Sequence, residues 1–497
     1  MSISKINQMN KHLTILGHRM KRIFPTLLFI GSPLGAESLR KFLLITFLLL
    51  DFILGNNKIN FNAMAPLHIM HYSDYNIEEE NDWILFGIHL EEAKRIGVEA
   101  ISVDVWWGLV EIQNNQFDWS YYIKVFDMII SNSLDIIPIM SFHSFDPGEG
   151  AGFRAPIPDW AWKLISKKSG FSVQDLKYNS EDVGKNGSHK FSDEYVSLWA
   201  DDWAFVEYRE FLQEFVNRFD NYLGFFQEIN ISLGPTGELR YPSYNGHDGG
   251  KHPNRGRLQC FSIPAQKHYL SWLKDSKPED DISKTEFIKS SDLKYRLENK
   301  DYLKDPDIQG LFDWYNGALM NHGNGMLKVA LSQIPEPIPI GFKIPGIHWR
   351  IEDPKTPRIS EMTCGLINSE SLNGQVAYSK SLKKVIKNLP LERLILHFTC
   401  IDQINSSPLN DFDEGYSRPE NLVIEVSSAA SELGLKIKGE NSLSNNLYKK
   451  SSWLKIEEIL AYKKLSGVTI MRLQDITQHN SLGNEQYREL IKNFGYK

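Results

Sequence analysis

Short apolar runs alternate with amphipathic stretches along this chain, from residue 66 to its end. The runs have the length of buried strands, and the stretches between them repeat apolar residues with helical spacing. Eight strands are predicted, at Leu67–Met70, Ala100–Trp107, Ile136–His143, Phe225–Leu233, Pro339–Trp349, Leu391–Thr399, Leu435–Glu440 and Val468–Leu473. The predicted helices are Trp83–Ile96, Trp119–Ser131, Trp203–Tyr222, Leu311–Leu331, Glu420–Leu433 and Ile456–Lys464.

Strands that alternate with helices indicate βαβ units and a parallel sheet. Eight strands favour a closed (β/α)8 barrel of the α/β class over an open sheet. The two longest insertions, Lys168–Asp202 and Asn245–Lys304, are rich in Ser, Lys, Asp and Glu. We interpret them as long loops on one face, so residues 64–497 are predicted to form one domain.

The first 63 residues differ from the remainder. They are basic early and then carry an apolar run from Phe42 to Leu54 that is interrupted by Asp51. This run is shorter than the roughly 20 residues of a membrane span. It resembles the apolar core of a signal peptide, and Ala63-Met-Ala65 has the form of a cleavage site, although the preceding stretch is long and Pro66 is unfavourable. Residues 1–63 are predicted to be a targeting, anchoring or disordered extension outside the fold, or an over-extended gene model.

If this extension acts as a signal, it directs the chain to a secretory or organellar route, and without it the chain is expected in the cytoplasm. Any membrane contact is expected only through residues 42–54. The sequence does not indicate an oligomeric state.

Composition narrows the classes of function. The chain is 42% hydrophobic and 24% charged, with a net charge of −7. This balance argues against a nucleic-acid partner, because binding to phosphates needs a basic surface. Three cysteines form no disulfide framework, and no metal-binding motif is present, so a metal site is not indicated.

Polar residues follow the apolar part of nearly every predicted strand. They are Asp104, His143, Lys343, His348, Thr399, Glu440, Asn441 and Arg472, and the fourth strand leads to Glu238. One such residue alone is most simply a satisfied polar group in the core. In a (β/α)8 barrel, however, the carboxyl ends of all strands meet at one face, and that face holds the active site.

Glu238 lies in the segment Gly234-Pro-Thr-Gly-Glu-Leu-Arg-Tyr-Pro-Ser-Tyr244. Glycine and proline suit a loop of fixed shape, so this carboxylate is a candidate general acid aimed into a cleft. The alternative is a surface loop in which Glu238 pairs with Arg240. Glu238 and Glu440 would form the carboxylate pair that glycoside hydrolysis needs, and the near-opposite positions of their strands favour the wide, inverting separation of about 6.5–9.5 Å.

The motifs together resemble those of the β-amylases, which cut maltose from the non-reducing ends of starch. The matching stretches occur in family order: Val103-Asp-Val-Trp-Trp-Gly108, Met140-Ser-Phe-His143, Leu233–Tyr244, Asn321-His-Gly323, Gly346-Ile-His-Trp349, Phe398-Thr-Cys400, Gly439-Glu-Asn441 and Arg472-Leu473. The resemblance covers the chain from about residue 66 to its end.

The resemblance implies an inverting hydrolysis of α-1,4 bonds in starch, amylopectin or maltooligosaccharides, without a cofactor. It implies that Glu238 donates the proton and that Glu440 is the base that activates water. It also implies sugar contacts by Asp104, His143, Lys343, His348, Thr399, Asn441, Ser442 and Arg472.

Three stretches depart from the family pattern. In the flap Ser144–Gly152, Ala151 occupies the position of an aspartate that closes over the sugar in the family. Ile401-Asp-Gln403 replaces Leu-Glu-Met, and Ser442-Leu-Ser-Asn445 replaces Ala-Leu-Pro-Arg. These changes keep two alternatives open: a catalytically impaired glucan or maltose binder on the same barrel, and an unrelated retaining glycosidase with its carboxylates about 5 Å apart.

Overall fold

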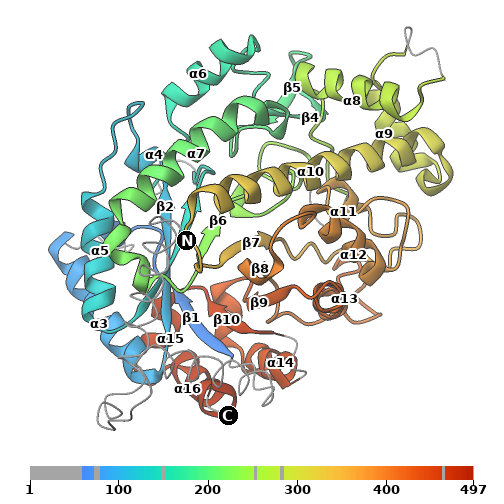
Figure 1. The fold of residues 1–497 in the computed structure, drawn as a ribbon. Helices are drawn as coiled ribbons and strands as arrows, with labels where there is room; N and C mark the ends of the chain where they lie inside the picture. The colour runs from blue at the N-terminus through green and yellow to red at the C-terminus, as the bar shows by residue number, and fades with distance from the viewer. Residues whose placement is uncertain are drawn as a thin grey trace, which may run out of the picture.

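The computed structural model describes residues 59–71, 79–146, 153–250, 255–279, 285–461 and 465–495. Eight parallel strands close into a barrel in the order β1-β10-β9-β8-β7-β6-β3-β2 (Figure 1). They are β1 (Asn60–Met64), β2 (Ala100–Trp106), β3 (Asp135–Ser141), β6 (Ile229–Ile231), β7 (Ile340–Ile344), β8 (Leu394–Phe398), β9 (Lys436–Glu440) and β10 (Gly467–Ile470). The predicted (β/α)8 barrel is confirmed.

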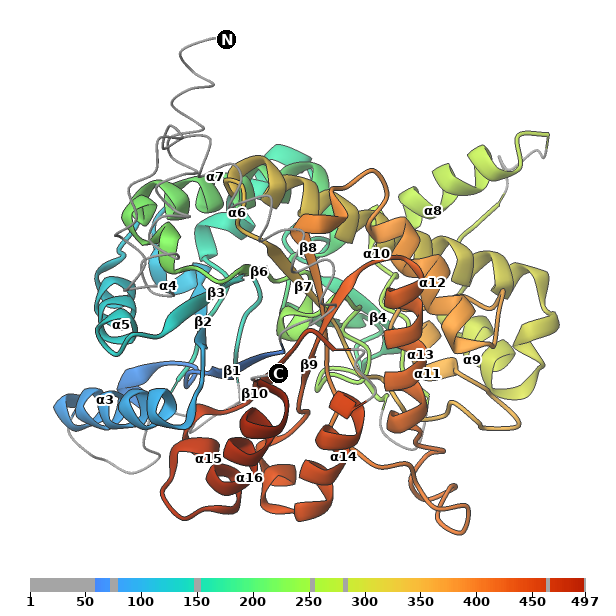
Figure 2. The same cartoon turned by 60° about the horizontal axis from the view of Figure 1, so that its bottom comes forward.

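Helices surround the barrel, as the tilted view in Figure 2 shows. They are α3 (Glu79–Ile96), α4 (Trp107–Val110), α5 (Ser120–Ser131), α6 (Asp159–Ser169), α7 (Asp201–Arg218), α8 (Ile263–Ser276), α9 (Ser290–Asn299), α10 (Pro306–Gln333), α11 (Ile359–Thr363), α12 (Gly374–Val385), α13 (Pro419–Glu432), α14 (Lys450–Ala461), α15 (Leu473–Thr477) and α16 (Leu482–Leu490). Short 3-10 or π turns are η1 (Ile69–His71), η2 (Leu198–Ala200), η3 (Asp220–Phe225), η4 (Pro235–Gly237), η6 (Tyr302–Lys304), η7 (Leu391–Arg393), η8 (Ser444–Tyr448) and η9 (Ile491–Gly495).

The first barrel strand is not where the sequence pattern placed it. Leu67–Met70, predicted as a strand, lies in a loop and the start of η1, whereas β1 is Asn60–Met64. β1 pairs with both β10 and β2 and so closes the barrel. The predicted boundary between residues 63 and 64 falls inside this strand. Residues 1–58, with their predicted targeting run, lie outside the described part of the chain.

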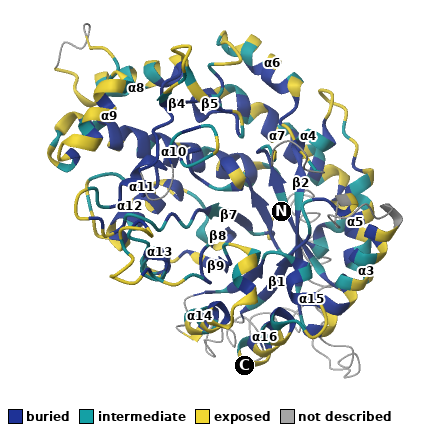
Figure 3. Ribbon diagram, turned by 180° about the vertical axis from the view of Figure 1, so that it is seen from behind, coloured by how far each residue is buried: buried dark blue, intermediate teal, exposed yellow. Residues whose placement is uncertain are grey.

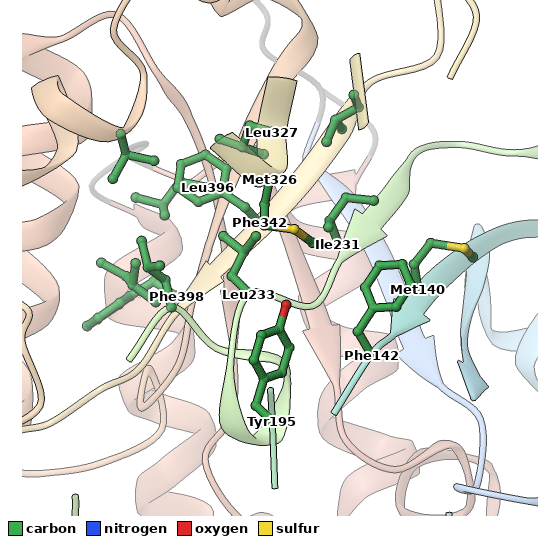
Figure 4. Close-up of a cluster of buried hydrophobic side chains, with 14 of the residues drawn as sticks. Met140, Phe142, Tyr195, Ile231, Leu233, Met326, Leu327, Phe342, Leu396 and Phe398 are labelled. Atoms are coloured by element: carbon green, nitrogen blue, oxygen red, sulfur yellow. The ribbon is translucent and has the colours of Figure 1, made fainter. Parts of the chain in front are cut away.

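The barrel strands and the sides of the helices that face them are mostly buried (Figure 3). Strand residues that face outward pack against the inner faces of the helices, as Phe61 does against Tyr487 with ring centroids 5.7 Å apart. Figure 4 shows one part of this core, where Met326 and Leu327 of α10 lie beside Ile231, Leu233 and other buried side chains. None of the described helices is both long and apolar enough to cross a bilayer.

The two predicted insertions pack against each other. The first holds an antiparallel hairpin, β4 (Tyr178–Val183) and β5 (His189–Ser192), and the second holds α8 and α9. Arg255 of the second insertion forms a buried salt bridge of 2.5 Å with Glu181 of the first. The insertions are thus partly buried, which the polar composition did not indicate.

Candidate active site

A cavity of about 350 Å³ opens among the carboxyl ends of the barrel strands. Nine of the ten residues predicted for the site line it: Asp104, His143, Glu238, Lys343, Thr399, Glu440, Asn441, Ser442 and Arg472. The side chains come from β2, β7 and β9 and from the segments that follow the strands. The barrel therefore brings together residues from distant parts of the chain, as the pattern at the strand ends suggested.

The loop that carries Glu238 is a tight turn after β6. Thr236 has a φ of 56° and Gly237 a φ of 80°, so the chain passes twice through the left-handed region. A Cβ atom on Gly234 would lie 2.5 Å from the carbonyl oxygen of Glu238, which explains why only glycine fits there. The N–H of Leu239 then donates to the carbonyl of Lys343 (2.7 Å) and fixes the turn to β7.

Glu238 is only 16% exposed, and its Oε2 accepts hydrogen bonds from Arg240 Nε and Thr236 Oγ1, both at 3.1 Å. Burial raises the pKa of Glu238 above its usual value, and the charge of Glu440 adds to the effect, although Arg240 and Lys343 oppose it. The ion pair of Glu238 and Arg240, which the surface-loop alternative predicted, thus exists, but Glu238 lines the cavity. A carboxyl group with a raised pKa suits a proton donor.

Glu440 is the last residue of β9 and lies in a different environment. Its Oε1 accepts a hydrogen bond from Lys343 Nζ at 2.8 Å, which forms a mostly buried salt bridge. Burial tends to lower the pKa of Lys343, but the negative charges of Glu440, Glu238 and Asp104 outweigh it and raise this pKa. Lys343 is thus a cation placed among three carboxyl groups, two of which are the candidate catalytic pair.

Asp104 and His143 lie on the β2 and β3 side of the cavity. Asp104 accepts a hydrogen bond from Ser141 Oγ (2.9 Å), and burial raises its pKa while Arg472 opposes the rise. His143 Nδ1 lies 2.9 Å from Ser232 Oγ, and burial together with the charges of Lys343 and Arg240 lowers its pKa to about 3. His143 is therefore neutral near pH 7 and suited to hydrogen bonds with hydroxyl groups.

A family model described as glycosyl hydrolase family 14 matches residues 64–497 of this chain. The chain belongs to this family. It is 30% identical to the thermophilic beta-amylase of Thermoanaerobacterium thermosulfurigenes over 448 residues, which cover 87% of this chain and 76% of the relative. It is 28% identical to the beta-amylase of Glycine max over 456 residues, or 84% of each chain.

A solved structure agrees with this membership of family 14. The catalytic domain of the beta-amylase from Paenibacillus polymyxa superposes with a TM-score of 0.70 at 26% identity, covering 89% of this chain and 99% of that domain. Together, the family match and these similarities identify a glycoside hydrolase of the beta-amylase kind.

The residues that depart from the family 14 pattern bond to one another. The buried carboxylate of Asp402 accepts from Ser442 N (2.8 Å), Ser442 Oγ (3.1 Å) and Asn446 Nδ2 (2.9 Å). Gln403 Nε2 donates to Ser442 Oγ (2.7 Å). The segment after β8 and the segment after β9 are thus tied together beside Glu440. Of the flap, Pro147–Gly152 lies outside the described residues, so the prediction about Ala151 is untested.

Thr399 and Asn441 have fixed positions in the cavity wall. Thr399 Oγ1 accepts from the N–H of Gly346 (2.8 Å). Asn441 makes two hydrogen bonds with the backbone of Met471, donating to its carbonyl (3.1 Å) and accepting from its N–H (2.8 Å). These bonds join the ends of β7 to β8 and of β9 to β10.

His348 is the one predicted site residue that does not line this cavity. The predicted strand ran to Trp349, but β7 ends at Ile344, so His348 lies four residues further along a loop. Its Nδ1 lies 2.9 Å from Ser417 Oγ, and its carbonyl accepts from the N–H of Arg418 (2.7 Å). A sugar contact by His348 stays a prediction.

Sequence reasoning missed the floor of the cavity. Asn230, His397 and Thr469 line it from β6, β8 and β10. Below them, Glu228 accepts hydrogen bonds from His397 and Lys438, both at 2.7 Å. The sequence contains a pattern that could have identified them, because each is a polar residue inside an otherwise apolar strand and faces the barrel interior.

No group of three or more His, Cys, Asp or Glu side chains that could hold a metal ion occurs among the described residues. The expectation of no cofactor stays untested.

Proposed function

We propose that this glycoside hydrolase is exo-acting, inverts the anomeric configuration and releases β-maltose from the non-reducing ends of α-1,4-glucans such as starch. The observation that carries the proposal is the placement of Glu238 and Glu440 in one cavity with unlike partners. Glu238 has a raised pKa that suits an acid, and Glu440 forms a salt bridge with Lys343 that suits a base.

In this reaction, Glu238 donates its proton to the glycosidic oxygen as the bond from C1 to that oxygen breaks. A water molecule attacks C1 from the opposite face of the sugar, and Glu440 accepts the proton that the water loses. Asp104, His143 and Arg472 are placed to bind sugar hydroxyls, because each presents a hydrogen-bonding group to the cavity.

The exo action can be tested with maltopentaose whose non-reducing end is blocked at the 4-hydroxyl group. The wild-type chain is expected to release maltose from free maltopentaose and from soluble starch, and to leave the blocked oligosaccharide intact. Cleavage of the blocked substrate would show that internal bonds are cut and would contradict the proposal.

A second candidate is a glucan binder with little or no turnover. The observation that favours it is the altered network of Asp402, Gln403 and Ser442 beside the base. Isothermal titration with maltose, run beside the starch assay, separates the two functions. Binding without turnover in the wild-type chain, unchanged by Glu238→Gln, would support the binder, whereas turnover that this substitution removes would reject it.

A further inference from the structure

The motif Asn321-His-Gly323 lies on α10, away from the cavity, and its role in a glycoside hydrolase is not evident from its position. His322 is completely buried and contacts two segments at once. Its Nε2 lies 3.0 Å from the carbonyl oxygen of Leu233, and its Nδ1 lies 2.9 Å from both carboxylate oxygens of Asp201.

The chemistry of these partners fixes where the imidazole protons lie. A backbone carbonyl only accepts hydrogen bonds, so Nε2 of His322 must carry a proton and donate it to Leu233. Nδ1 of the ring therefore faces Asp201, and a second proton is shared between Nδ1 and the carboxylate of Asp201. Asp201 is the first residue of α7. The pair of His322 and Asp201 therefore links α7, which precedes β6 in the chain, to α10, which follows it.

Leu233 lies two residues beyond the end of β6, where the turn that carries Glu238 begins. Its N–H donates to the carbonyl of Gly237 (3.3 Å), which closes the turn, and its carbonyl is held by His322. Figure 4 draws the Leu233 side chain in one buried cluster with Met326 of α10, the residue one helical turn beyond His322. One end of the turn is therefore anchored to α10 by a hydrogen bond.

The neighbouring residue of the motif contacts the other end of the turn. A Cβ atom on Gly323 would lie 2.9 Å from Cδ2 and 3.1 Å from Cδ1 of Leu239, the buried residue that directly follows Glu238. Glycine at this position gives Leu239 the room to pack on the helix. Two consecutive residues of α10 thus contact both ends of the segment that carries the acid.

We infer that His322, oriented by Asp201, is a positioning residue that holds the Leu233–Leu239 turn so that the carboxyl group of Glu238 reaches the glycosidic oxygen. This inference rests on the proposed function, because it gives a role to the residue assigned there as the acid. A general acid contributes about 10²–10⁴-fold to a rate, and a misplacement of about 1 Å can cost about 10²-fold.

A pair of substrates that differ in their need for acid separates positioning from mere stability. Maltopentaose needs a proton on its leaving oxygen, whereas fluoride leaves from α-maltosyl fluoride with little assistance. We expect His322→Leu to lower kcat on maltopentaose by about 10- to 100-fold and on α-maltosyl fluoride by less than about threefold. Glu238→Gln in the same assays is expected to show the same selectivity to a larger degree.

Asn324 supplies a matched control on the same helix. It is also buried and donates to two backbone carbonyls, those of Val385 (2.7 Å) and Lys387 (3.0 Å), but neither belongs to the acid-bearing turn. Asn324→Leu is expected to lower the melting temperature, as His322→Leu does, and to leave the ratio of the two rates at the wild-type value.

The Asp201 variants repeat the comparison if His322→Leu does not fold. In Asp201→Asn the amide can donate to Nδ1, so that His322 keeps its proton on Nε2, and we expect the wild-type ratio of rates. Asp201→Ala leaves the ring unanchored and is expected to slow maltopentaose selectively.

Equal slowing of both substrates in the variants, while the wild-type chain hydrolyses both, overturns this inference alone. A wild-type chain that hydrolyses neither substrate overturns the proposed function, and this inference with it.

Discussion

Glu238 and Glu440 belong to one class of side chain, and their neighbours give them different properties. Arg240 is the strongest cationic influence on Glu238, and it lowers a pKa that burial has raised. An acid must be protonated to act, so activity falls as the pH rises through the pKa of Glu238. The alkaline limb of the pH profile should therefore lie above the usual range for a glutamate.

Arg240→Gln tests this account of the acid. Loss of the guanidinium removes an effect that lowers the pKa of Glu238, so the pKa should rise and the alkaline limb of kcat/KM should move to higher pH. The measurement is kcat/KM on maltopentaose across the pH range, with Arg257→Gln as a control, since Arg257 pairs with Asp182 in the insertions. An alkaline limb that stays in place or moves to lower pH would contradict the assignment.

At the scale of single residues, the sequence was sufficient to predict which face of the barrel is reached by groups in the last residues of a strand. Glu440 and Asp104 were predicted because the order of strands determines which face they reach. The role of His322 could not be predicted in this way, because it bonds to a backbone carbonyl, and no side-chain pattern marks such a partner. His348 was misplaced because β7 ends before the predicted strand does.

At the scale of elements, a buried ionic group links three barrel strands beneath the site. Glu228 of the β6 segment bonds His397 of β8 and Lys438 of β9. Burial tends to raise the pKa of Glu228, but the charges of Lys438 and His397 prevail and lower it to about 2. Because the pKa of Glu228 is lower in the folded chain than in the unfolded chain, its ionised carboxylate stabilises the fold at pH values above the unfolded-state pKa. This contribution is lost as the pH falls from about 4 toward 2.

Glu228→Gln is expected to lower the free energy of unfolding by about 3–5 kcal/mol at pH 7, because Lys438 would remain buried without its anion. Urea denaturation followed by circular dichroism measures the difference. The exposed pair of Glu370 and Lys380 is the control, and Glu370→Gln should cost at most about 1 kcal/mol. The deficit of Glu228→Gln should shrink between pH 4 and pH 2, and a constant deficit would contradict the role of the charge.

The same polar interior explains why β1 escaped prediction. Asn60 and Asn62 alternate with Phe61 and Ala63, and Asn62 Nδ2 donates to Gln227 Oε1 inside the barrel (3.0 Å). Phe61 and Ala63 therefore face the helices, and the two asparagines face inward. A pattern search that expects a wholly apolar parallel strand passes over such a segment.

At the scale of the whole molecule, closure of the barrel depends on β1, which is the first described element of the chain. A chain shortened to begin at Lys58 retains β1 and should unfold at nearly the wild-type temperature with wild-type activity on starch. A chain that begins at Pro66 lacks the strand between β10 and β2, so it should lose cooperative unfolding and activity. Thermal melts and a starch assay check both variants, and an active Pro66 chain would contradict this description of the barrel.

The fold class could be predicted because seven of the eight predicted strands overlap barrel strands, and their alternation with helical patterns leaves few alternatives to a parallel barrel. The packing of the two insertions could not be predicted, because the buried pair of Arg255 and Glu181 joins two segments whose composition resembles that of exposed loops. Long-range pairing of charged residues leaves no periodic pattern in a sequence.

In the proposed mechanism, an acid and a base flank one glycosidic bond, with a water molecule between the base and the sugar. Proton NMR of the first maltose released from maltopentaose tests it most directly, with wild type beside Glu238→Gln and Glu440→Gln. We expect β-maltose from the wild-type chain and a loss of about 10²-fold or more in kcat for each variant. Release of α-maltose, or undiminished turnover in either variant, would contradict the account.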